Sequence, residues 1–216
     1  MPFKLPSHSR LWAEFLILFG GAPLLVLAIR ERWFMVALMW GSAAMIAFVL
    51  HKFYKRRHAV EWNWPGFRAG IGDVLLQVAA VTPIFVMILW LFLPESFLSL
   101  PRERFELWVR IMFLYPLLSV WPQELVYRSF IYHRYQPIFG KEKYYIAAST
   151  LAFAWMHIIF LNSVAVLLTL CGGYLFSRSY AKNNSLALVC AEHALYGCML
   201  FTVGYGWFFF SGAAWR

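Results

Sequence analysis

Charged residues are scarce in this sequence, and their scarcity excludes an ordinary water-soluble domain. Asp, Glu, Lys and Arg make up 13% of the 216 residues, hydrophobic residues make up 62%, and the mean hydropathy is +0.63. Soluble domains carry about 25% charged and about 45–50% apolar residues. A single water-facing domain cannot bury so large an apolar excess, so the composition predicts an integral membrane protein.

Cysteine is also rare. The three cysteines, Cys171, Cys190 and Cys198, all lie in apolar segments. Their odd number and their spacing exclude the disulfide framework of a small secreted protein and a zinc knuckle. The sequence also lacks an H-E-x-x-H motif, an internal repeat and a Gly/Ser linker. We therefore expect one membrane domain, in which the cysteines are packing residues.

Long apolar runs are abundant, and a bilayer core of about 30 Å needs roughly 20 apolar residues per helix. The sequence therefore predicts an all-α fold, a polytopic transmembrane helical bundle of about seven spans, at residues 11–29, 33–50, 73–93, 108–130, 144–162, 163–178 and 185–210. Residues 1–72 are expected to form a helical hairpin and a basic loop, ahead of a core at 73–216. A second apolar run follows the first almost at once, so we expect a retained first helix and not a cleaved signal peptide.

Basic residues outnumber acidic ones by 19 to 10, which gives a net charge of +9. The basic clusters, such as 51–58 and 140–145, lie between apolar spans. This placement favours a role in membrane topology over nucleic-acid binding, and no nucleic-acid partner is expected. With seven spans, twelve Lys and Arg residues fall in loops on one side and five on the other. The richer side, which includes the N-terminus, is predicted to be cytoplasmic.

Ionisable side chains inside a span are costly and usually face a cavity or one another. Asp73 lies at the start of a predicted span, where an acid in the first helical turn is favourable, and Arg110 can extend to the headgroups. Glu124 and Arg128 are four residues apart, so they share one helical face and can form an ion pair.

The depth of three side chains predicts a shared site. Glu124 lies about ten residues from the cytoplasmic end of its span, which is roughly 15 Å. His193 lies at nearly the same depth in another span, and His157 lies roughly 20 Å deep in a third. We expect these side chains to converge in a cavity that opens toward the cytoplasm.

A carboxylate with two imidazoles suits two kinds of hydrolysis. Glu124, His157 and His193 can bind a zinc ion and leave one position open for water. Without a metal, Glu124 and one histidine can activate water while the other histidine stabilises the oxyanion. The spacing leaves both alternatives open.

Three segments, QELVYR (123–128), FAWMH (153–157) and HALYG (193–197), resemble the motifs of the CPBP family, the CAAX-protease and bacteriocin-processing (Abi) membrane proteases. The motifs of that family are Glu-Glu-x-x-x-Arg, Phe-x-x-x-His and His-x-x-x-Asn/Asp. The resemblance implies an α-helical intramembrane endopeptidase, in a bacterial plasma membrane, that cleaves near the C-terminus of prenylated or other membrane-associated proteins and peptides. The partners it implies are membrane lipid and the C-terminal tails of substrates.

The resemblance also assigns roles to residues. It gives Glu124 a supporting role with Arg128. Because the first glutamate is absent, we expect Glu124, His157 and His193 to be the catalytic residues, with Gln123, Arg128, Phe153 and Gly197 in supporting positions.

Two positions depart from the family pattern. Gln123 replaces the glutamate that is taken to activate water, and a carboxamide can orient water but cannot accept its proton at neutral pH. Gly197 replaces the Asn or Asp that binds the oxyanion. Glu192 is a weaker candidate for the missing carboxylate, because neighbouring residues on a helix point about 100° apart.

These departures leave alternatives to an active protease. A catalytically silent family member can bind substrate tails or partner helices in the same cavity. A proton-coupled transporter also uses membrane carboxylates and histidines, although the sequence shows no two-half repeat.

Overall fold

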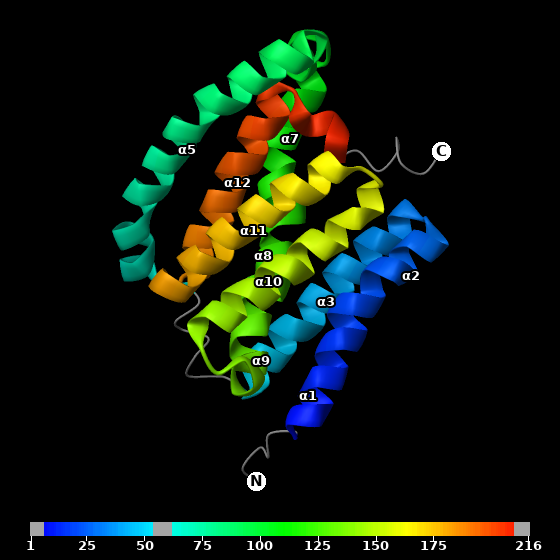
Figure 1. Ribbon diagram of the computed structural model, residues 1–216, viewed down its shortest axis with the longest axis vertical. Helices are drawn as coiled ribbons and strands as arrows, with labels where there is room; N and C mark the ends of the chain where they lie inside the picture. Colours follow the sequence, from blue (N-terminus) through cyan, green and yellow to red (C-terminus); the bar gives the residue numbers. More distant parts are fainter. Residues whose placement is uncertain (1–6, 54–61, 210–216) are drawn as a thin grey trace.

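The computed structural model describes residues 7–53 and 62–209, and these ranges are helical with no strand among them (Figure 1). The predicted all-α membrane bundle is therefore confirmed. The helices are α1 (His8–Phe15), α2 (Ala22–Ile29), α3 (Arg32–Phe53), α5 (Trp64–Phe92), α6 (Ser99–Glu103), α7 (Phe105–Tyr115), α8 (Trp121–Glu124), α9 (Ile131–Phe139), α10 (Glu142–Met156), α11 (Ser163–Asn183) and α12 (Leu186–Val203). Short 3₁₀ turns span Pro94–Ser96, His157–Phe160 and Tyr205–Phe209.

Two of the long helices contain π-helical turns. The turn Leu16–Gly21 joins α1 to α2, and the turns Pro116–Val120 and Leu125–Phe130 join α7, α8 and α9 into one helix over residues 105–139. The first turn includes the adjacent glycines Gly20 and Gly21. A π turn adds one residue to a helical turn and changes the direction of the side chains that follow.

Five helical segments in the described ranges are long and apolar enough to cross a membrane, namely His8–Ile29, Arg32–Lys52, Trp64–Phe92, Ser163–Asn183 and Leu186–Val203. The helix over residues 105–139 and α10 complete the seven long segments, and both pack among these five. Many large apolar side chains on the outer faces are exposed, as expected where lipid is the solvent.

The start of α5 corrects one sequence expectation. The helix begins at Trp64 instead of residue 73, after Asn63, whose side chain accepts a hydrogen bond from the amide of Gly66. Asp73 is therefore an interior helical residue that pairs with Lys182 at 3.3 Å, and its assignment to the first turn is wrong. The helix starts in a polar segment ahead of the apolar run, and a boundary between residues 72 and 73 falls inside it.

The connections position the helices that carry the histidines. Only Leu161 and Asn162 separate the 3₁₀ turn after α10 from α11, so these two helices lie side by side and antiparallel (Figure 1). Helix α12 packs against α5 and α11, and the helix over 105–139 contacts α12 in turn. Residues 105–139 therefore contact the helices before and after them in the sequence.

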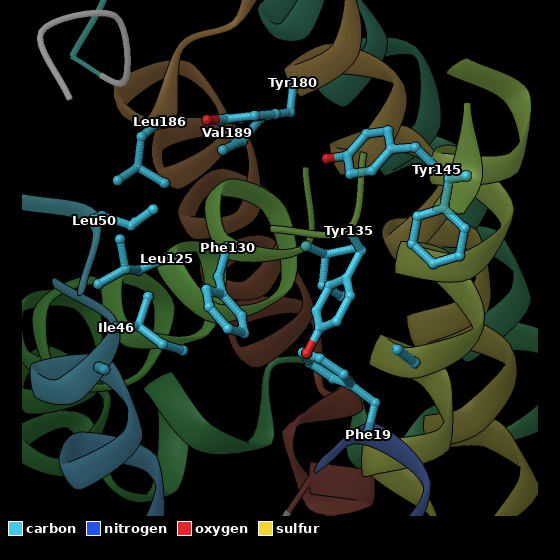
Figure 2. Close-up of a cluster of buried hydrophobic side chains, with 14 of the residues drawn as sticks. Phe19, Ile46, Leu50, Leu125, Phe130, Tyr135, Tyr145, Tyr180, Leu186 and Val189 are labelled. Atoms are coloured by element: carbon cyan, nitrogen blue, oxygen red, sulfur yellow. The ribbon is translucent and has the colours of Figure 1, made fainter. Parts of the chain in front are cut away.

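The largest core cluster surrounds the helix over residues 105–139, which is called the central helix below. Figure 2 shows Leu125 beside Ile46 and Leu50 of α3, and Tyr135 beside Phe19 of the first π turn. Beside this cluster, Arg134 binds the Glu14 carboxylate through two nitrogens at 2.9 and 2.7 Å, and the hydroxyl of Tyr135, a member of the cluster, donates to the same carboxylate at 3.0 Å. These contacts fix α1 against α9.

Close packing between α5 and α11 predicts a difference between two glycines of α5. A Cβ atom at Gly66 would overlap the backbone carbonyl of Asn183, whereas a Cβ at Gly72 would meet no atom within 4 Å. We expect Gly66→Ala to reduce the free energy of unfolding by about 1–3 kcal/mol. Gly72→Ala should leave it unchanged or raise it by about 0.5–1 kcal/mol. Thermal unfolding in detergent measures both, and equal midpoints would contradict the close contact.

Candidate active site

Glu124 lies at the point where the central helix changes geometry twice. The π turns Pro116–Val120 and Leu125–Phe130 flank the single turn of α8 that ends at Glu124. Pro116 and Pro122 have no amide proton to donate, so the regular ladder of hydrogen bonds is interrupted in this part of the helix. The altered geometry aims Glu124 and Arg128 into the bundle, where both side chains are fully buried.

The Glu124 carboxylate contacts two partners on two helices. Its Oε2 lies 3.0 Å from Nε of Arg128, one turn later on the same helix, and its Oε1 lies 2.8 Å from Nδ1 of His193 on α12. A buried carboxylate is tolerated when a cation and hydrogen bonds compensate for lost hydration. The arrangement therefore combines the predicted ion pair with a carboxylate–imidazole contact between helices.

Arg128 is held by further contacts. Its Nη1 donates to the Ser149 hydroxyl of α10 at 2.9 Å, and that hydroxyl donates to the Tyr127 carbonyl at 2.8 Å. The guanidinium also lies over the rings of Phe153 and Phe176, 4.6 and 5.6 Å from their centroids. Hydrogen bonding and cation–π attraction thus hold the guanidinium in place.

The acceptors beside the two histidines determine their tautomers. The Glu124 carboxylate can only accept, so Nδ1 of neutral His193 carries the proton. The Phe153 carbonyl also can only accept, and Nδ1 of neutral His157 donates to it at 2.7 Å. In both rings Nε2 then carries a lone pair. Both histidines line one cavity of about 420 Å³.

Phe153 links the two imidazoles. Its ring centroid lies 4.6 Å from the ring of His157 and 5.6 Å from the ring of His193, and it also packs beneath Arg128. The structure thus places His193 in contact with Glu124, and His157 lines the same cavity as His193. No hydrogen bond joins Glu124 to His157 within the ranges that the structure covers.

Gln123 lies on the cavity wall, one residue before Glu124. Its Nε2 donates to the Ser119 hydroxyl at 2.7 Å, which leaves the amide oxygen as an acceptor. A second cavity, of about 590 Å³ and bordered by α3, shares Ser119, Gln123, His157 and Phe160 with the first. The two cavities therefore adjoin at Gln123 and His157.

Gly197 also lies on the first cavity, in van der Waals contact with an aromatic side chain of α7. A Cβ atom at Gly197 would overlap Cε1 and the hydroxyl of Tyr115. The Tyr115 ring meets the ring of His193 edge to face at 5.9 Å. The sequence reasoning missed Tyr115, because a tyrosine in an apolar span resembles any other packing or interfacial aromatic.

Glu192 lies outside the cavity lining. It is fully buried beside Ser179 of α11, while the neighbouring His193 faces the cavity. This separation agrees with the 100° rotation between successive helical residues. Glu192 therefore does not stand in for the carboxylate that Gln123 replaces.

The predicted zinc ligands do not form a complete set. Among the residues that the structure describes, no group of three His, Cys, Asp or Glu side chains has the spacing to hold a metal ion. Both oxygens of Glu124 already face Arg128 and His193, and of the three predicted ligands only the two histidines line the cavity. These side chains do not fit a three-ligand zinc centre.

Comparison with protein families gives one match. Residues 105–199 match the family described as "Type II CAAX prenyl endopeptidase Rce1-like". The matched segment contains all three motifs, and the match supports the protease family that these motifs predict. Comparison with curated proteins and with solved structures gave no match.

The central helix contains two Glu–Arg pairs at the same spacing, which gives a matched test of burial. Arg128→Met leaves Glu124 buried without a cation, and we expect a loss of about 3–5 kcal/mol in the free energy of unfolding. Glu106 and Arg110 form an exposed pair at 3.6 Å, so Arg110→Met should cause no measurable loss. Thermal unfolding in detergent distinguishes the variants, and equal stability would contradict the buried ion pair.

Proposed function

We propose that this protein, whose residues 105–199 belong to the family of type II CAAX prenyl endopeptidase Rce1-like proteins, is an intramembrane endopeptidase that hydrolyses a peptide bond near the C-terminus of membrane-associated substrates. The observation that carries the proposal is the contact between the buried Glu124 carboxylate and His193, which leaves Nε2 of the imidazole on the cavity side. This is the arrangement of a general base with a carboxylate that orients it.

His193 is the proposed general base. Nε2 takes a proton from water as the water oxygen attacks the substrate carbonyl, and later gives that proton to the leaving amine. Glu124 fixes the tautomer of His193 and stabilises the imidazolium that forms. Arg128 and His193 each contact one oxygen of Glu124, so the carboxylate acts on the substrate through His193 and not directly.

Gln123 and His157 are the proposed water-positioning residues. The amide oxygen of Gln123 and Nε2 of His157 are both acceptors on the same cavity. A water molecule that donates to one of them can present its oxygen to the carbonyl. This role needs no proton transfer to Gln123, so it is compatible with a carboxamide at that position.

The two adjoining cavities support an apolar, elongated substrate. Both are lined mainly by apolar and aromatic side chains, and they meet beside Gln123 and His157. A C-terminal tail in one cavity and a lipid-modified or apolar segment in the other would place the bond between them at the histidines. The proposed partners are such tails and the surrounding lipid.

The proposed location is the plasma membrane of a bacterium, with the N-terminus in the cytoplasm. The bias of Lys and Arg toward alternate loops supports this orientation.

Cleavage of a prenylated peptide that ends in a CAAX sequence tests the proposal. The purified protein in detergent should release a C-terminal fragment, detected by mass spectrometry. His193→Gln and Glu124→Gln should each lower kcat at least about 100-fold, because each removes part of the general base. Glu106→Gln, a carboxylate 89% exposed on the same helix, should retain the wild-type rate. Full turnover in His193→Gln would contradict the assignment of the base.

Gln123→Glu separates a weakened enzyme from a silent binding protein. A glutamate at this position can accept the hydrogen bond of the Ser119 hydroxyl and adds a second proton acceptor to the cavity. We expect kcat to rise above the wild-type value while the KM for the same peptide changes little. Tight peptide binding with no cleavage by the wild type or by Gln123→Glu would favour the silent family member.

A further inference from the structure

Hydrolysis needs a hydrogen-bond donor for the oxyanion, and the histidines cannot supply it as neutral rings. The carbonyl of Phe153 and the carboxylate of Glu124 accept from Nδ1 of His157 and His193, so both Nε2 atoms carry lone pairs toward the cavity. One of the two N–H groups of the Gln123 amide donates to the Ser119 hydroxyl. The family position that supplies an Asn or Asp is Gly197, which has no side chain.

Tyr115 fills the space beside Gly197. The overlap with a Cβ atom at this glycine involves Cε1, Cζ and the hydroxyl of the phenol, so a side chain at position 197 and the Tyr115 ring exclude one another. Where the family has an Asn or Asp side chain at the position of Gly197, this protein therefore has the phenol of Tyr115, which comes from another helix and lines the same cavity.

The Tyr115 side chain is held in this position by ring contacts. It packs edge to face on His193 at 5.9 Å and on Phe201 at 5.2 Å, between their ring centroids. Among the residues that the structure describes, no hydrogen bond engages its hydroxyl, although the side chain lines the cavity. The hydroxyl is therefore a free donor beside the proposed general base.

We infer that the Tyr115 hydroxyl is the oxyanion donor of this protein and that Gly197 makes room for it. The inference rests on the proposed hydrolysis. As the water oxygen bonds to the carbonyl carbon and His193 takes the water proton, the carbonyl π electrons move to oxygen. The phenol donates a hydrogen bond to that oxygen. When the carbonyl re-forms, the C–N bond breaks and the amine receives the proton from His193.

Tyr115→Phe removes the hydroxyl and keeps the ring that packs on His193 and Phe201. With the prenylated CAAX peptide, we expect kcat to fall about 100-fold, the usual loss for one oxyanion donor, with little change in KM. Tyr174→Phe removes a hydroxyl from an exposed ring of α11 and should retain the wild-type kcat. If kcat is unchanged in Tyr115→Phe, the inference is wrong. Cleavage of the peptide by the wild type would still support the proposed function.

A paired substitution tests the exchange between the two positions. Tyr115→Ala should lower kcat as Tyr115→Phe does, and Gly197→Asn alone should lower the unfolding midpoint because its side chain meets the phenol. The double variant Tyr115→Ala/Gly197→Asn should regain both the midpoint and about tenfold or more of the turnover lost in Tyr115→Ala. Simple additivity of the two losses would contradict a shared position.

A readout without turnover separates the two proposals. The probe is a prenylated peptide in which a ketomethylene group replaces the scissile amide, and the measurement is the infrared stretch of the bound ketone. The ketone should absorb at lower frequency in the wild type than in Tyr115→Phe, because a phenol donor weakens the C=O bond. Equal frequencies overturn the inference. If the ketone band is shifted but the wild type cleaves no peptide, Tyr115 is a hydrogen-bond donor to the bound carbonyl and the proposed hydrolysis is wrong.

Discussion

The structure depends on a carboxylate that is buried where water cannot solvate it. Glu124 has no exposed surface, and it is stabilised by the Arg128 cation and by the Nδ1 proton of His193. Removal of Arg128 would leave the Glu124 charge without a cation in an apolar interior, and removal of His193 would leave Oε1 without a hydrogen-bond donor. The positions of α12 and α10 follow from this requirement, since one supplies the histidine and the other supplies Ser149 to Arg128.

The same requirement limits what Glu124 can do. An oxygen that already faces a guanidinium or an imidazole proton is a poor acceptor for a proton from water. The carboxylate therefore acts on the cavity through His193, and the position next to it, Gln123, faces the cavity directly. Aromatic rings pack on His193, because Phe176 stacks on its face and Phe153 meets it at a right angle.

Much of the fold could be predicted, because lipid leaves few ways to satisfy the backbone. Apolar runs of span length predicted the helices, and errors arose where a helix continues into polar sequence. Helix α5 starts at Trp64 because Asn63 caps it ahead of the apolar run, and the central helix continues past residue 130 through α9. Between α5 and the central helix, the chain forms the 3₁₀ turn Pro94–Ser96 and the short helix α6.

The site was predictable where it depends on spacing within one helix, as for Glu124 and Arg128. Contacts between helices were harder. Depth alone placed His157 and His193 at one level, and the structure puts only His193 on Glu124. Tyr115 had no recognisable signal in the sequence, because its position depends on a contact with Gly197 on another helix. The π turns also follow no spacing rule, although Pro116 marks one of them.

The Glu124–Arg128 pair lies within a single helix, and this has a consequence for biogenesis. Because the two residues are one turn apart, their charges can neutralise each other as soon as that segment is helical, before any neighbouring helix arrives. Insertion of the segment into the bilayer then involves a dipole instead of two separate ions. Only the later association with α12 requires His193, so membrane entry and assembly of the site are separate events.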